Sequence, residues 1–225
     1  MLPLCPEIGI FAKTNLVNGM YKPMALVLVG MLAGMLSACA DRAEAGHLPI
    51  HPKEMKLREG DVVFRLGGGL TSRAVLSVDP DGAYSHVGMV VREGNRLMIV
   101  HAVPGEPDFE GDPDRVKLDA PDRFFAKMNA LAGEVCRPAD SLVARRAARV
   151  ALEYFSRRTL FDHRYDDKDT TAVYCTELIA HAFRRVGRPI VGTPAHRFTL
   201  PGLQVVCWLP SDIHRSRFLK TVYKF

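Results

Sequence analysis

The sequence predicts a single α+β domain that combines a small antiparallel sheet with helices. Two apolar segments, residues 86–91 (HVGMVV) and 97–103 (LMIVHAV), flank a short polar stretch that is typical of a β-hairpin turn. Residues 140–158 and 175–186 instead repeat apolar side chains at helical spacing. At 225 residues, 48% hydrophobic and 24% charged, the chain suits one ordinary globular core, which excludes a disordered or collagen-like protein.

The N-terminal region has the features of a secretory signal. Residues 24–38 (MALVLVGMLAGMLSA) contain no charge and follow Lys22. The stretch is short for a membrane span, which needs about 20 apolar residues, and fits a signal-peptide core of about 7 to 15. Residues 36–39 (LSAC) resemble the lipobox of bacterial lipoproteins, in which the cysteine is acylated and becomes the new N-terminus. We therefore expect residues 1–38 to be a signal peptide, with Met20 as the true start, and Cys39 to be lipidated; the alternatives are an uncleaved anchor and a buried core helix.

The remaining chain divides into a tether and a domain. Residues 39–52 are small, polar and interrupted by proline, which predicts a tether, and residues 53–225 form the domain. Without residues 1–38 the chain has 28 basic and 24 acidic residues, a net charge of +4 that is spread along it and does not predict a nucleic-acid partner. We expect the protein on the periplasmic face of a bacterial envelope membrane, bound through its lipid. Ala40 after the cysteine resembles outer-membrane sorting in enteric bacteria.

Within the domain, residues 61–66 (DVVFRL) predict the first strand, and the glycines at 67–69 predict a mobile loop that lines a cleft. These glycines lack the Lys-Ser/Thr ending of a phosphate-binding loop. In the hairpin that follows, a two-residue turn at positions 94–95 (GN) would place Gly88 opposite His101. His86 would then be a diagonal neighbour of His101 on the same sheet face, whereas a three-residue turn would separate the two histidines.

A further strand and two helices complete the predicted elements. Residues 133–137 predict a strand and residues 140–158 a helix. In the helix at 175–186, Cys175 points toward the apolar stripe, while His181 points away by roughly 120° and is expected on the surface.

Three cysteines, Cys136, Cys175 and Cys207, belong to the domain. In an oxidising compartment the odd count suggests one free thiol and a disulfide between Cys136 and Cys207, although three buried cysteines would fit as well. No Cys-x-x-Cys is present and the histidines lack paired-ligand spacing, so no metal site is expected.

The position of Cys175 favours a nucleophile. At the first turn of a helix, unpaired backbone N–H groups and the helix dipole favour the thiolate, and the same groups can stabilise an oxyanion. The alternative is a small buried side chain that completes the core stripe.

Three motifs carry a resemblance to a known family: residues 57–64 (LREGDVVF), 84–90 (YSHVGMV) and 174–179 (YCTELI), with LPSD at 209–212. They resemble the permuted papain-like amidases of the YaeF/YiiX type, circularly permuted relatives of the NlpC cysteine peptidases. The resemblance implies an α+β fold in which a small antiparallel sheet packs against helices. The order of the active-site residues in that family is His, a third polar residue, then Cys.

The resemblance also implies residue roles: Cys175 is the nucleophile, His86 the general base and His101 the residue that orients it. Many relatives have glutamate at the position of His101, and a histidine there resembles the lecithin retinol acyltransferase group. Tyr84 and Tyr174, next to these residues in sequence, are candidates to bind substrate or donate to the oxyanion, or else pack in the core.

The expected function is that of a lipid-anchored cysteine hydrolase, an amidase or peptidase, which acts without a cofactor or metal on peptidoglycan peptides or acyl lipids of the envelope. Two alternatives remain open at this point. The first is a lipid acyltransferase or thioesterase-like enzyme, and the second is a non-catalytic binding lipoprotein that keeps the cleft without the chemistry.

Overall fold

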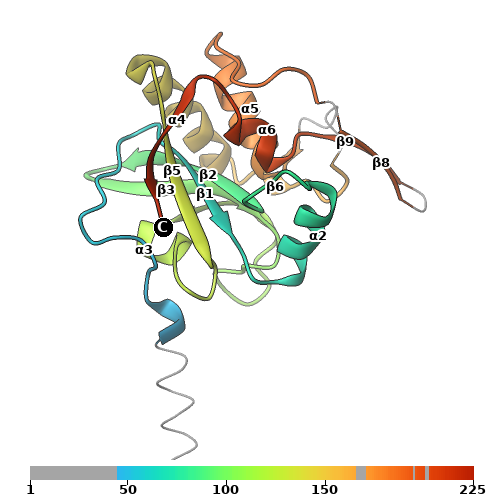
Figure 1. The fold of residues 1–225 in the computed structure, drawn as a ribbon, viewed down its shortest axis with the longest axis horizontal. Helices are drawn as coiled ribbons and strands as arrows, with labels where there is room; N and C mark the ends of the chain where they lie inside the picture. The colour runs from blue at the N-terminus through green and yellow to red at the C-terminus, as the bar shows by residue number, and fades with distance from the viewer. Residues whose placement is uncertain (1–44, 166–170, 195, 201–202) are drawn as a thin grey trace, which may run out of the picture. The chain divides into compact units, whose positions relative to one another are not determined.

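The computed structural model describes residues 45–165, 171–194, 196–200 and 203–225, and Figure 1 shows the elements that they form. The strands are β1 (Val62–Leu66), β2 (His86–Glu93), β3 (Arg96–Val103), β4 (Arg115–Asp119), β5 (Ala132–Pro138), β6 (Leu160–Phe161), β7 (Ala172–Val173), β8 (His196–Leu200), β9 (Leu203–Cys207) and β10 (Leu219–Lys224). The helices are α2 (Leu70–Val78), α3 (Pro121–Phe124), α4 (Ser141–Ser156), α5 (Cys175–Arg185) and α6 (Pro210–His214).

The sheet is mostly antiparallel, with the strand order β10-β5-β1-β2-β3-β4-β6-β7; only β6 and β7 pair in parallel, and β8 and β9 form a separate hairpin. The β2–β3 register pairs Glu93 with Arg96 and Met89 with Val100. The two-residue turn at 94–95 is therefore confirmed, and it places the side chains of His86 and His101 on one face.

The main core lies between the sheet and helices α4 and α5 (Figure 1). Apolar side chains of the two helices pack on those of β1, β2 and β3; they include Ala147, Ala151, Leu178 and Ile179 on the helices and Phe64, Val87, Met89 and Val100 on the sheet. A smaller core covers the opposite face, where Phe124 and Phe125 at α3 pack on Val63, Val90 and Ile99. The expected α+β architecture, a mostly antiparallel sheet packed against helices, is confirmed.

The turn before β1 brings the sheet close to α4. Gly60 has a φ of +90°, and a Cβ at this position would lie 2.5 Å from the backbone carbon of Ala144. Only glycine fits both the backbone conformation and the contact. The next residue, Asp61, accepts hydrogen bonds from the Arg58 N–H and the Arg137 guanidinium, each at 2.8 Å. Gly60 thus lets this turn approach α4 closely, while Asp61 ties the turn to Arg137 on β5.

The chain N-terminal to the predicted domain is described only in part. The expected signal peptide and Cys39 lie outside the described residues. Part of the expected tether packs on the domain: the Ile50 N–H donates to the Phe125 carbonyl at 2.9 Å, and the compact unit that contains the sheet includes residues from Gly46 onward. In the described part of the chain, none of the helices is both long and apolar enough to cross a membrane.

Candidate active site

Cys175 and His86 line the same cavity, which has a volume of about 590 Å³. The cavity opens where β1 ends, β2 begins and α5 begins. The glycines at 67–69 form part of its wall, as expected of a loop that lines a cleft, and lead directly into α2, which the sequence analysis did not predict. Most of the lining side chains are apolar; they include Val75, Val78, Ala102, Phe161, Tyr165, Phe198, Trp208 and Leu209.

The thiol of Cys175 lies among backbone N–H groups. Those of Val87, Thr176 and Cys175 itself interact with the sulfur, and the Arg65 guanidinium acts on it electrostatically. Burial nevertheless raises the pKa of Cys175 to about 11, because the loss of hydration outweighs the N–H groups and the nearby cation. The expectation that the helix N-terminus favours a resting thiolate is therefore wrong. At neutral pH Cys175 is therefore a neutral thiol.

A relay of hydrogen bonds extends from His86 into the core. His86 Nε2 lies 2.9 Å from His101 Nδ1, and His101 Nε2 lies 3.1 Å from Asp119 Oδ2. Because an ionised carboxylate can only accept, His101 Nε2–H donates a hydrogen bond to Asp119. This leaves His101 Nδ1 as an acceptor for the Nε2–H of His86. His86 Nδ1 is then unprotonated in the neutral ring. The relay prepares His86 to accept a proton, which is what a general base requires.

Burial and nearby charges shift the pKa values of His86 and Asp119, the two ends of this relay. Burial, together with the positive charge of Arg65 and the proximity of His101, holds the pKa of His86 well below its usual value of 6.5. Burial acts to raise the pKa of Asp119, but the hydrogen bond from His101 and the nearby cations Arg123 and Lys117 lower it overall. His86 is therefore neutral and Asp119 ionised near neutral pH.

Two members of the site, Arg65 and Asp119, were not found from the sequence. Arg65 pairs with His86 in the β1–β2 register, so both side chains lie on one sheet face. Its guanidinium is buried, binds the Glu106 carboxylate and donates to the Phe124 carbonyl at 3.1 Å. Asp119 ends β4, one strand beyond His101. A polar residue at alternate positions of a third strand is the only sequence signal that points to it.

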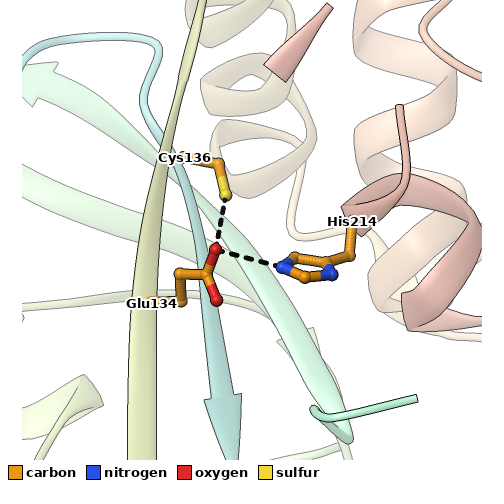
Figure 2. Close-up of side chains that lie close together, drawn as sticks. All are labelled: Glu134, Cys136 and His214. Carbon is orange, nitrogen blue, oxygen red and sulfur yellow. Dashed lines mark hydrogen bonds and ion pairs between the residues drawn. The ribbon is translucent and has the colours of Figure 1, made fainter. Parts of the chain in front are cut away.

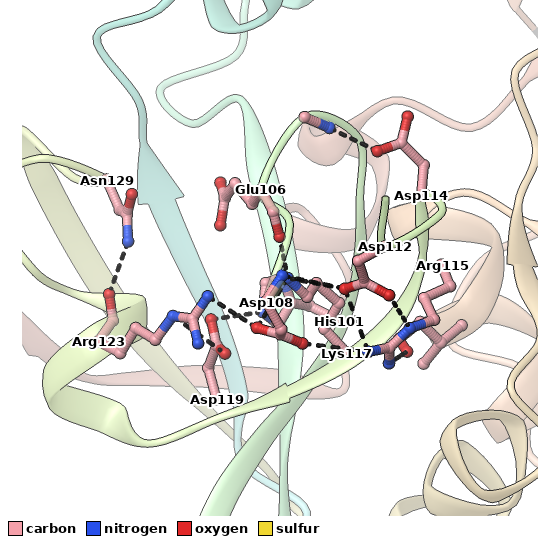
Figure 3. Close-up of polar contacts among 12 residues, drawn as sticks. His101, Glu106, Asp108, Asp112, Asp114, Arg115, Lys117, Asp119, Arg123 and Asn129 are labelled. Carbon is pink, nitrogen blue, oxygen red and sulfur yellow. Dashed lines mark hydrogen bonds and ion pairs between the residues drawn. The ribbon is translucent and has the colours of Figure 1, made fainter. Parts of the chain in front are cut away.

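A network of ion pairs holds the loop between β3 and β4 against the site (Figure 3). Lys117 is 2% exposed and binds Asp108 at 3.0 Å and the Glu106 carbonyl. Arg123 binds Asp108 at 2.8 Å and lies 3.5 Å from Asp119. The network fixes the loop that carries Glu106 into the cavity wall, and thereby the partner of Arg65.

Of the two candidate tyrosines, one contacts the cavity. Tyr174 lines it, but its hydroxyl accepts the Trp208 N–H at 3.1 Å. Tyr84 is buried elsewhere and donates to Glu134 at 2.6 Å, the arrangement of a packed core residue. His181, which was expected on the surface, is partly exposed: its side chain is 19% exposed, and its ring packs edge-on against Trp208.

The expected pairing of Cys136 with Cys207 is wrong, because both cysteines are free. Cys136 faces Glu134 and Thr221 between β5 and β10. Cys207 ends β9 and lines the Cys175 cavity. An odd number of cysteines in the sequence does not show whether any two of them lie close enough to form a disulfide.

The raised pKa of Cys175 predicts how this thiol reacts with a simple alkylating agent. At pH 8 a thiol of pKa 11 is ionised in about one molecule in a thousand, against about one in ten at the ordinary value of 9.0. Allowing for the greater nucleophilicity of a more basic thiolate, we expect iodoacetamide to modify native Cys175 roughly ten- to a hundredfold more slowly than the unfolded chain. The rate should rise with pH up to about 11.

Mass spectrometry of the peptide that carries Cys175, in native and urea-unfolded samples, measures both rates. A fast plateau in the native rate through neutral pH would instead indicate a preformed thiolate–imidazolium pair and contradict the neutral pair described here.

Comparison with known proteins supports the fold. No protein-family model matches the chain, and no curated protein matches it in sequence. A solved structure with a similar fold is the crystal structure of the metalloprotein yiiX from Escherichia coli O157:H7. The two share 16% sequence identity at a TM-score of 0.58, over 76% of this chain and 99% of that one. At this identity the similarity is one of fold, and it agrees with the YaeF/YiiX-type architecture expected from the motifs.

Proposed function

We propose that this protein is a cysteine hydrolase of the permuted papain-like type, which cleaves an amide or ester bond through an acyl-enzyme on Cys175. The observation that carries the proposal is the His86–His101–Asp119 relay, because it leaves an unprotonated nitrogen on a histidine that lines the same cavity as the thiol. If His86 and His101 were only a packed pair in the core, no cavity would be expected beside His86.

In the proposed reaction, His86 Nδ1 takes the proton from the Cys175 thiol as the sulfur attacks the substrate carbonyl carbon. The N–H groups of Cys175 and Thr176 at the start of α5 then donate to the oxygen that becomes negative. His86 returns the proton to the leaving amine or alcohol as the carbonyl re-forms. Water, deprotonated by the same ring, releases the acid and restores the thiol. Asp119 and His101 orient His86 throughout and stabilise its charged form.

The apolar cavity wall supports a substrate whose acyl part is hydrophobic. Phe161, Val78 and Leu209 offer no charge to hold a stem peptide, while Arg65 is occupied by Glu106. Acyl lipids of the envelope therefore fit this cavity better than peptidoglycan peptides. An acyltransferase remains the second candidate, because an alcohol that attacks the same acyl-enzyme in place of water would form an ester.

Incubation of the purified protein with N-acyl and O-acyl lipids and with peptidoglycan fragments, followed by mass spectrometry of the products, tests the proposal. A free acid that is formed by wild type and not by Cys175→Ser supports hydrolysis. Transfer of the acyl group to an added alcohol would favour the acyltransferase, and no turnover of any substrate class, with an unreactive Cys175, would favour the binding lipoprotein.

The proposal places the enzyme at the envelope membrane through a lipid on Cys39, on the strength of the LSAC motif at 36–39. In a bacterial host, labelled palmitate should appear on wild type and disappear in Cys39→Ala. The intact mass should correspond to a chain that begins at a diacylated or triacylated Cys39. A mature N-terminus elsewhere, without lipid, would make this an ordinary secreted protein and leave the proposed chemistry untouched.

A further inference from the structure

A second cluster of reactive side chains lies apart from the cavity, between β5, β10 and α6 (Figure 2). Glu134 and Cys136 are two residues apart on β5, so both point to the same face of the strand. His214 reaches them from α6, 80 residues along the chain from Glu134. One ligand atom from each side chain, Oε1, Sγ and Nε2, lies within 4.8 Å of the other two.

The separations resemble the edges of a metal coordination tetrahedron. Glu134 Oε1 lies 3.0 Å from His214 Nε2 and 3.4 Å from Cys136 Sγ. In tetrahedral zinc sites with bonds of about 2.0 to 2.3 Å, neighbouring ligand atoms are roughly 3.3 to 3.6 Å apart. The third separation, between Cys136 Sγ and His214 Nε2, is within 4.8 Å, so an ion at the centre would draw together side chains that already converge.

The chemical nature of the three ligands selects the ion. We infer that Glu134, Cys136 and His214 bind Zn²⁺, the common divalent ion whose protein sites combine thiolate, imidazole and carboxylate. On binding, the S–H bond of Cys136 breaks, its proton leaves to solvent and a Zn–S bond forms. The thiolate and the carboxylate together balance the charge of the ion.

The surroundings of the cluster have the form of a supporting shell. The Tyr84 hydroxyl donates to Glu134 Oε2 at 2.6 Å, and thus holds the carboxylate with Oε1 directed toward Cys136 and His214. Thr221 on β10 lies 3.9 Å from Cys136 Sγ and donates to Glu134 Oε1. Groups that orient metal ligands in this way commonly affect metal affinity by about 10- to 100-fold.

The site joins distant parts of the fold. Glu134 and Cys136 are buried, while the His214 side chain is 29% exposed and gives the ion a route from solvent. Three protein ligands leave a fourth position for water or for the Thr221 hydroxyl. Bound zinc would link α6, which follows the cavity-lining Leu209, to the strands β5 and β10 at the edge of the sheet.

Zinc content and a cobalt spectrum of the full-length protein test this inference. After saturation with Zn²⁺ and dialysis, elemental analysis should find about one zinc per chain. Co²⁺ added to the metal-free protein should give the absorption of a four-coordinate ion and a thiolate-to-cobalt charge-transfer band. Cys136→Ser should remove the charge-transfer band, and His214→Gln, at a partly exposed position that tolerates the change, should weaken binding at least 10-fold.

Two further variants make the result specific. Cys175→Ser should bind Zn²⁺ like wild type, because the metal site is separate from the cavity thiol, so loss of the proposed hydrolase activity and loss of metal can be told apart. Tyr84→Phe should fold and bind about 10-fold more weakly. Absence of zinc from folded wild type, a cobalt spectrum without thiolate character, or binding that depends on Cys175 and not on Cys136 would each overturn the inference.

Discussion

The Cys175→Ser variant is expected to lose both substrate turnover and covalent labelling by an acyl electrophile, without loss of folding. Serine is nearly the same size as cysteine, and the surrounding backbone N–H groups can bind a hydroxyl as well as a thiol. Its oxygen is a far weaker nucleophile than sulfur in a site whose base has a low pKa, so the rate should fall to background. Initial rates and the mass of the intact protein after labelling measure the effect.

Cys207→Ser is the matched control, because this cysteine lines the same cavity and is also free. It should leave the label on Cys175. Unchanged labelling of Cys175→Ser, with the label on another cysteine, would show that the nucleophile has been misassigned.

Replacing His86 with alanine should slow acylation by about 10²- to 10⁴-fold at neutral pH. With the thiol of Cys175 held at a pKa of about 11, almost no thiolate exists unless a base removes the proton during the attack. The loss should therefore shrink as the pH is raised toward 11, because hydroxide then ionises the thiol directly. Stopped-flow measurement of acylation across this range provides the test.

His101→Gln provides the graded comparison. The glutamine side chain can still accept a hydrogen bond from His86, but it lacks the imidazole ring that links His86 to Asp119. Acylation should therefore be slower than in wild type and remain measurable. If His86→Ala acylates at the wild-type rate, or if its defect is the same at every pH, His86 is not the base.

The sequence indicated the parts of the site that lie within one hairpin or one helix. A two-residue turn at 94–95 determines the register of β2 and β3, and that register alone places His86 beside His101. The helical stripe that begins at Cys175 likewise predicted α5, whose observed end at Arg185 differs by one residue from the expected one. These features depend on local periodicity, which a single sequence contains.

Residues that neighbouring strands bring to the site could not be predicted from local periodicity. Arg65 faces His86 only because β1 pairs with β2, and Asp119 reaches His101 only because β4 lies next to β3. The strand order that produces these neighbours is a property of the whole fold. The cluster of Glu134, Cys136 and His214 could not be predicted for the same reason, because His214 on α6 lies far along the sequence from the two residues on β5.

The charge state of Cys175 was misjudged for an energetic reason. The start of a helix does supply N–H groups, and they do act on the sulfur, but their effect is smaller than the cost of burying a thiolate in this wall of apolar side chains. Burial is a tertiary quantity. Burial also lowers the pKa of His86, so Cys175 is a neutral thiol and His86 a neutral imidazole.

The central claim, that a Cys175 thiol activated by the His86 relay carries the acyl group, is tested most directly by trapping the intermediate in the unmodified protein. A slowly hydrolysed acyl substrate is mixed with wild type, the reaction is quenched in acid within its first turnover, and the added mass is located in the peptides by tandem mass spectrometry. The account predicts one acyl group on the peptide that contains Cys175. An acyl group on Cys136 or Cys207, or product formation with no trapped thioester at all, would contradict it.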